Sequence, residues 1–165
     1  MNISLSLQEE FQLRIFDESY PRIENCLQRI TDEQLWLAPN ENMVSIGCLI
    51  KHLLGNMQQW VYAGILLHSF DRDRDAEFVP EPRLKRSDLI LQMEAVKIKL
   101  NEVLNELNED RLSAQLEIQD FNTTGLSAVI HVIEHFSYHT GQIALLTKLF
   151  VNEDLGFYDG YELDK

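Results

Sequence analysis

Four long segments of the chain repeat apolar residues at three- and four-residue steps, and this spacing constrains the fold more than any other feature. Apolar side chains at such steps share one face of an α-helix. The clearest segment, after Ser87, carries Leu89, Met93, Val96, Leu100, Val103, Leu104 and Leu107. The other three are expected at about 6–30, 45–70 and 126–150. The simplest architecture for four such helices is a bundle.

The segments between the helices predict long connections. Residues 71–86, DRDRDAEFVPEPRLKR, are charged and contain prolines, so they are expected to form a surface loop. In the connection before the last helix, AQLEIQDF alternates enough to be extended. The acidic, aromatic tail after residue 150 is expected to pack on the surface. The fold class is therefore all-α, a four-helix bundle with long crossover connections, formed by one domain over residues 1–165.

Several residues predict local features of these helices. Pro21 should kink the first helix, because a proline inside a helix removes one backbone hydrogen bond. Ser45 is a plausible N-cap of the second helix. Gly47, Gly55 and Gly64 in that helix permit the close approach of a neighbouring segment.

The net charge of −13 disfavours nucleic acid and anionic membranes as partners, because both require positive charge to meet phosphate. No apolar run approaches the roughly 20 residues that span a bilayer, and the N-terminal residues do not resemble a secretory signal. The two cysteines, Cys26 and Cys48, form no CxxC pair and are expected to be ordinary buried thiols. These features favour a cytoplasmic protein.

Three of the five histidines, His131, His135 and His139, lie four residues apart in HVIEHFSYHTGQ. Positions i and i+4 of a helix share a face, so two of these imidazoles can converge on one metal ion. His131 and His139 are about 12 Å apart along the helix axis and should not share an ion. The candidate pair is therefore His131 with His135, or His135 with His139.

A third metal ligand would have to come from another helix. His52 and His68 both lie on the second predicted helix, about 160° apart around its axis, so only one can face the fourth helix. His52 lies among apolar residues and needs a polar partner there, whereas His68 lies beside the charged loop. The alternative is that these histidines only satisfy one another and water. Glu134 is expected to be a surface charge rather than a general base.

Two motifs make the chain resemble the DinB-like (YfiT-like) superfamily of four-helix-bundle metalloproteins. They are SIGCLIKHLLGNMQQW in the second predicted helix and HVIEHFSYHTGQ in the fourth. The resemblance implies a metal site made by His52, His135 and His139, with Gln142 closing the second motif. It places His131 one turn away, as a pocket wall or a residue behind the ligands.

The same resemblance implies a range of activities. Characterised members of the superfamily include thiol S-transferases that use bacillithiol or mycothiol and a mycothiol-dependent isomerase, and many are dimers that hold nickel or zinc. It therefore implies one divalent ion, nickel or zinc, and a homodimer. Three histidines alone do not identify the metal, because imidazole suits several transition metals.

The hypothesis for function is a metal-dependent enzyme in which a small-molecule thiol is activated and attacks an electrophile. The alternatives are a hydrolase that uses a metal-bound water and a non-catalytic, metal-binding dimer. Asn56 and Trp60 follow His52 at one and two helical turns and are candidate pocket residues. Core packing is the competing explanation for Trp60, and a backbone hydrogen bond is that for Asn56.

Overall fold

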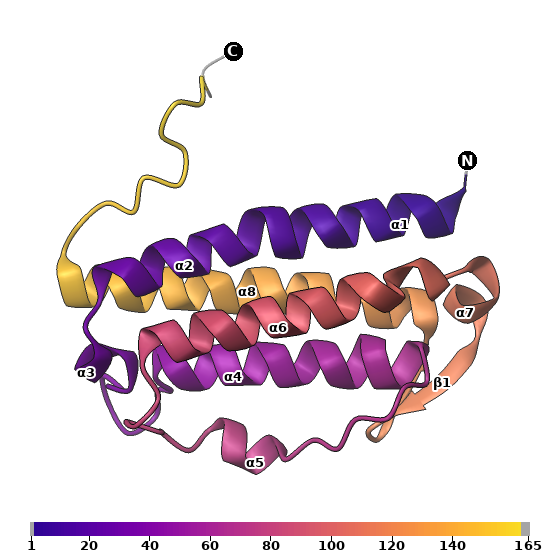
Figure 1. The fold of residues 1–165 in the computed structure, drawn as a ribbon, viewed down its shortest axis with the longest axis horizontal. Helices are drawn as coiled ribbons and strands as arrows, with labels where there is room; N and C mark the ends of the chain where they lie inside the picture. The colour runs from indigo at the N-terminus through magenta and orange to yellow at the C-terminus, as the bar shows by residue number, and fades with distance from the viewer. Residues whose placement is uncertain (1, 163–165) are drawn as a thin grey trace.

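The computed structural model describes residues 2–162, and four long helices run side by side through it (Figure 1). Each long helix is built from one or more helical elements in succession. The elements are α1 (Ile3–Phe11), η1 (Gln12–Ser19) and α2 (Tyr20–Arg29) in the first; α4 (Ile46–Met57) and η2 (Gln58–Ile65) in the second; α6 (Arg86–Val103) and η3 (Leu104–Glu106) in the third; and α8 (Gly125–Val151) in the fourth. The structure thus confirms an all-α bundle.

The direction of the helices explains the long connection in the middle of the chain. In Figure 1, α4 and α6 run in the same direction, whereas the first long helix and α8 run in the opposite one. Parallel neighbours cannot be joined by a short turn, so the chain returns along the length of the bundle through residues 66–85. We call this segment the crossover; it contains the short helix α5 (Arg74–Glu77).

Short elements close the two ends of the bundle. At one end α3 (Asp32–Leu35) precedes α4, and at the other α7 (Glu109–Ser113) precedes an antiparallel hairpin of β1 (Gln115–Ile118) and β2 (Phe121–Thr124). The extended conformation expected for AQLEIQDF is therefore confirmed. The side chain of Ile118 is buried.

The core lies between the four long helices, and every one of them contributes to it. Complete burial of a valine, leucine, isoleucine or phenylalanine side chain stabilises a fold by about 1.5–3 kcal/mol. The most completely buried side chains include Phe11, Ile15, Ile46, Leu89, Leu100, Val129, Val132 and Ile143. Cys26 and Cys48 are buried and free, as expected.

Polar side chains cap the starts of α4 and α8. Ser45 accepts a hydrogen bond from the backbone N–H of Cys48 at 3.3 Å, which confirms it as the N-cap of α4. Thr124 accepts one from Ser127 and caps α8 in the same way. These bonds satisfy N–H groups that have no partner within the helix.

Pro21 interrupts the regular hydrogen bonding of the first long helix, but the helix does not end there. The proline lies in the first turn of α2, directly after the π-helical stretch η1. The N–H of Tyr20 donates to Ile15, five residues earlier, and the Ser19 hydroxyl donates to the carbonyl of Arg14 at 2.7 Å. The change of helix type accommodates the proline.

The three glycines of the second long helix each face a neighbouring side chain. A Cβ atom at Gly47 would meet the ring of Trp36, one at Gly55 would meet the carboxylate of Glu77, and one at Gly64 would meet Ile118. The expected close approach is therefore confirmed at all three positions.

Three expectations need correction. The second long helix ends at Ile65 rather than near residue 70. The crossover is not only a surface loop, because it contains α5 and the buried side chain of Glu77. The tail packs on the bundle only at first: Leu155 is buried, and Arg22 lies over the ring of Phe157. From there the chain leads away from the bundle (Figure 1), and Tyr161 is 71% exposed.

Within residues 2–162, the structure contains no helix with the length and apolar character needed to cross a bilayer.

Candidate metal centre

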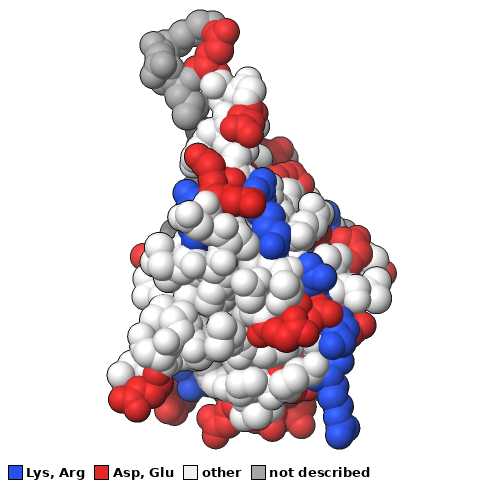
Figure 2. Space-filling model, turned by 90° about the vertical axis from the view of Figure 1, so that its left-hand side faces the viewer, with Lys and Arg blue, Asp and Glu red and all other residues white. Residues whose placement is uncertain are grey.

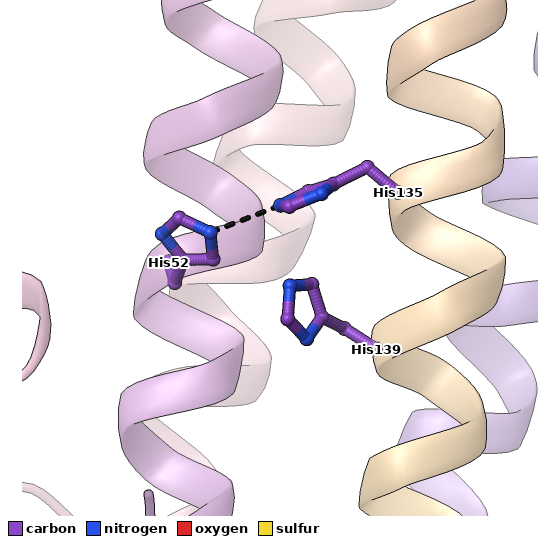
Figure 3. A group of neighbouring side chains, drawn as sticks. All are labelled: His52, His135 and His139. Carbon is purple, nitrogen blue, oxygen red and sulfur yellow. Dashed lines mark hydrogen bonds between the residues drawn. The ribbon is translucent and has the colours of Figure 1, made fainter.

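Three imidazole rings meet between two long helices. His52 projects from α4, and His135 and His139 project from α8, so that the rings point toward one another (Figure 3). The Nε2 atoms of His52 and His135 are 2.9 Å apart. One nitrogen from each of the three rings lies within 4.8 Å of those of the other two.

The packing of the two helices produces this arrangement. His135 and His139 are one turn apart on α8, which puts both side chains on the same face. α4 lies antiparallel to α8 and presents His52 to that face. His52 is buried, with 7% of its surface exposed, whereas His135 and His139 are half-buried. His52 is therefore shielded from solvent, whereas His135 and His139 are partly exposed.

The nitrogen of His52 that faces away from the cluster is held by a buried ion pair. His52 Nδ1 lies 2.9 Å from Glu77 Oε2, and Arg72 donates to the two oxygens of the same carboxylate at 2.6 and 2.8 Å. The side chains of Arg72 and Glu77 are only 5% and 8% exposed. An ionised carboxylate only accepts hydrogen bonds, so Nδ1 of His52 carries the proton and its Nε2 offers a lone pair to the cluster.

Sequence reasoning missed Arg72 and Glu77. Both lie in the charged stretch that was expected to be solvated, and nothing in its composition separates them from Asp71, Asp73 or Arg74. The one sequence signal was Gly55, three residues after His52. It leaves room on the same side of α4 for the Glu77 carboxylate.

His139 is oriented in a similar way by Gln142. His139 Nδ1 lies 2.6 Å from Gln142 Oε1, and the amide nitrogen of Gln142 donates to the hydroxyl of Tyr138 at 3.1 Å. Nδ1 of His139 is therefore the donor, and its Nε2 is free to act as a ligand. Since His52 Nε2 also offers a lone pair, His135 must donate in the 2.9 Å contact when no metal is bound.

Burial favours the uncharged form of the two α8 imidazoles, because it lowers the pKa of each. It lowers the pKa of His135 to about 3, with the neighbouring charges of His139 and His52 adding to the effect. Burial also lowers the pKa of His139, although the bond to Gln142 opposes this. Burial would raise the pKa of Glu77, but the bonds from Arg72 and His52 outweigh it and hold the pKa below its usual value. Neutral imidazoles beside an ionised carboxylate suit a cation.

The cluster fits a divalent transition metal. Three protein ligands and one open position are typical of catalytic zinc sites, and imidazole nitrogen is a common ligand for zinc and nickel. Zn–N bonds of about 2.0–2.1 Å in a tetrahedron separate the ligand nitrogens by about 3.3 Å. That value lies between the 2.9 Å contact and the 4.8 Å limit within which the three atoms lie.

The other residues that the sequence pointed to lie next to the cluster on one side. The ring of His131 lies between those of Trp60 and His135, with centroid distances of 4.2 and 5.3 Å. Trp60 and Asn56 are buried, and within the described chain neither Trp60 Nε1 nor Asn56 Oδ1 has a hydrogen-bond partner. His131 is thus outside the three-nitrogen cluster and forms part of the wall beside it.

Two further candidates lie away from the cluster. The ring of His68 is stacked on that of Tyr62, and its Nε2 lies 3.2 Å from a carboxylate oxygen of Glu106. His68 is therefore held by these two side chains and does not take part in the cluster. Glu134 is exposed on α8, as expected for a surface charge.

Comparison with known proteins supports the fold. A model of the family described as "Protein of unknown function (DUF1572)" matches residues 9–157. The chain belongs to the DUF1572 family. No curated protein sequence matches this member of the family.

Solved structures with the DinB-like fold resemble this DUF1572 protein. A DinB-like protein from Bacillus cereus ATCC 10987 is 15% identical with a TM-score of 0.65, over 82% of this chain and 87% of that chain. The DinB-like protein YjoA from Bacillus subtilis is 15% identical with a TM-score of 0.63, over 88% and 91%. A conserved protein from Enterococcus faecalis is 15% identical with a TM-score of 0.66, over 93% and 99%. The DinB-like fold predicted from the two motifs is therefore confirmed.

The depressed pKa of His135 predicts that the metal-free protein loses stability in mild acid. The ordinary pKa in an unfolded chain is 6.5, whereas the folded value is about 3. Below pH 6.5 the unfolded chain binds a proton that the folded protein refuses, so the free energy of unfolding falls as the pH decreases. Thermal unfolding of chelator-treated protein between pH 7.5 and 5 should show this decrease, and His135→Gln should reduce it. An equal dependence of stability on pH in the wild type and in His135→Gln would contradict the lowered pKa of His135.

Proposed function

We propose that this protein is a metal-dependent enzyme that binds one divalent ion, nickel or zinc, through His52, His135 and His139 and acts on small molecules. The observation that carries the proposal is the convergence of three imidazole nitrogens within 4.8 Å. Glu77 and Gln142 hold the outward nitrogens of two of these rings, so their inward nitrogens are available as ligands. His135 and His139 are only half-buried, so a substrate could reach the cluster.

Within this class, we propose a thiol transferase. A divalent ion in a three-histidine site lowers the pKa of a thiol or water at its open position, which supplies a nucleophile at neutral pH. The neutral His131 ring, packed beside His135, would wall one side of the bound thiol. The buried Trp60 N–H and Asn56 carbonyl would hydrogen-bond to polar groups of the substrate, which compensates their burial.

A small apolar hollow near His139 suits the other reactant. It has a volume of about 200 Å³, and Gln142, one of its lining residues, forms the hydrogen bond to His139. Its lining is Asn42, Met43, Val44, Leu49, Gln142, Leu145 and Leu146. Figure 2 shows that the end of the bundle where α3 lies and α8 terminates carries a broad uncharged surface, with acidic and basic side chains around its edge. An uncharged electrophile with a small apolar group fits this approach.

Protein purified without a histidine tag is expected to contain about one nickel or zinc ion per chain by elemental analysis. Loss of one ligand in His139→Ala should reduce metal affinity by at least about 100-fold, measured by competition with a chromophoric chelator. His68→Ala removes an imidazole outside the cluster and serves as the matched control. A metal-free wild type, or equal affinities for the two variants, would refute the site.

The metal-loaded protein is expected to accelerate conjugation of monochlorobimane with at least one low-molecular-weight thiol. Asn56→Ala should raise KM for the thiol about 3- to 10-fold by removing one hydrogen bond, with metal content unchanged. Ester hydrolysis without conjugation would instead favour the hydrolase alternative. Metal binding without either reaction would favour a non-catalytic metal-binding bundle.

We also propose that the protein is a homodimer. One face of α8 exposes Ile130, Tyr138 and Leu145, and a groove of about 660 Å³ between η1 and α8 carries charges of both signs, such as Arg14 and Glu134. Such a surface can complement a copy of itself around a two-fold axis.

Free, buried Cys26 and Cys48 support a reducing, cytoplasmic location.

Sedimentation equilibrium is expected to show a dimer that Leu145→Glu dissociates, because the substitution places a charge in the proposed apolar interface. Leu91→Glu is the matched control, since Leu91 is also an exposed leucine but lies on α6, outside this face. A monomeric wild type would exclude the dimer. If Leu91→Glu were monomeric as well as Leu145→Glu, the result would not support an interface on this face of α8.

A further inference from the structure

We infer that Glu77 is a positioning residue for the metal ligand His52, and that the crossover is therefore an integral part of the metal site whose order is coupled to metal binding. The inference rests on the proposed metal binding by His52, His135 and His139. It assigns a role to a segment that carries none of the three ligands.

The first support is the geometry around His52. The Glu77 carboxylate lies 2.9 Å from Nδ1 of His52, on the side of the ring opposite the cluster. A hydrogen bond there sets the rotation of the ring and leaves Nε2 directed at the other two histidines. Phe78, the next residue of the crossover, covers the same ring with a centroid distance of 4.9 Å. Two adjacent residues of the crossover thus restrict the imidazole.

The second support is the way in which Glu77 is itself held. Arg72 binds both oxygens of the carboxylate, which is the strongest pairing available to it. Both side chains are almost wholly shielded from water, and removing charges from water is costly. Such a pair adds little to stability compared with apolar packing. Its specific effect is to present a carboxylate oxygen to His52.

The third support is the space reserved for the carboxylate. A Cβ atom at Gly55 would overlap Oε1 of Glu77, so α4 accepts the carboxylate only because this position lacks a side chain. Gly55 is not needed for backbone conformation, since it lies inside a regular helix with no positive φ. Glycine inside a helix costs about 1 kcal/mol relative to alanine. The glycine therefore serves the contact between α4 and the crossover.

The crossover is attached to α4 at the residue adjacent to His52 as well. The ammonium group of Lys51 donates to the backbone carbonyls of Ala76 and Val79, at 2.7 and 3.1 Å, and pairs with Glu81. Lys51 binds the crossover without contacting the histidine cluster, whereas Glu77 binds directly to His52, one of the three proposed metal ligands. Coupling between two sites is reciprocal. If the ordered crossover strengthens metal binding, the bound metal must stabilise the crossover to the same extent.

Zinc affinity, measured by competition with a chromophoric chelator, tests the positioning role. Glu77→Gln keeps a hydrogen-bond acceptor but loses the charge, and Glu77→Ala loses both. Both variants should bind zinc about 10- to 100-fold more weakly than the wild type, and Glu77→Ala should bind it more weakly than Glu77→Gln. Glu81→Gln is the matched control, because it alters a crossover carboxylate that binds Lys51 and not His52. Cobalt(II) absorption bands should shift in the Glu77 variants and not in Glu81→Gln. Circular dichroism verifies that each variant is folded.

Hydrogen–deuterium exchange of peptides within residues 66–85 tests the coupling. Adding zinc should slow exchange there in the wild type and in Glu81→Gln, and should have little effect in Glu77→Ala. Gly55→Ala should behave like the Glu77 variants, because it displaces the carboxylate while leaving every polar group in place. Gly141→Ala, also in a helix but with open space around the added Cβ, should behave like the wild type.

The outcomes separate the two proposals. If wild-type protein binds neither zinc nor nickel, both the proposed function and this inference fail. If the wild type binds metal and the Glu77 variants bind it equally well with unchanged cobalt bands, the inference alone fails. The same holds if zinc leaves exchange in the crossover unchanged. A fall in melting temperature without a change in metal affinity would show that Glu77 is only structural.

Discussion

The antiparallel packing of α4 against α8 is the interaction on which the rest of this molecule depends. Buried residues such as Leu49 and Leu53 on α4, and Val132 and Phe136 on α8, remove apolar surface from water and bring the two helices together. That contact places His52 beside His135, although 83 residues separate them in the chain. A pair of histidines on one helix becomes a group of three only through this long-range contact.

The topology of the bundle places a second layer behind the histidines. Because α4 and α6 are parallel, their connection has to travel the length of the bundle, and it passes along α4 on the side away from α8. His52 is thus enclosed between α8 and the crossover. A buried pair of charges is costly unless its hydrogen bonds are satisfied. Here Arg72 and His52 together satisfy the hydrogen bonds of the Glu77 carboxylate, so the buried charge lies directly beside His52.

The two ends of the histidine row differ in their surroundings. Toward the hairpin, the row meets Trp60 and His131, which present aromatic faces and a buried N–H. Toward the end of α8, it meets Gln142 and an apolar hollow. Trp60 lies on the π-helical stretch η2, where the helix is wider than an α-helix and side chains are redirected. The surroundings of the cluster are therefore polar and aromatic on one side and apolar on the other.

By itself, the sequence determined the features that depend on neighbours in the chain. The helical period predicted the four long helices, Ser45 predicted the start of α4, and the four-residue spacing of His131, His135 and His139 predicted a pair of histidines on one face. All three predictions follow from local backbone geometry. Sequence reasoning failed for Arg72 and Glu77, since a charged stretch in a strongly acidic chain has the composition of a solvated loop whether or not it is covered. Helix geometry left open which histidine of the second helix joins the pair, and the resemblance to the DinB-like superfamily implied His52. Only the tertiary structure revealed which carboxylate lies behind His52. These contacts depend on how segments that are distant in the chain pack together. The burial of side chains that stabilises this packing cannot be deduced from a local sequence pattern.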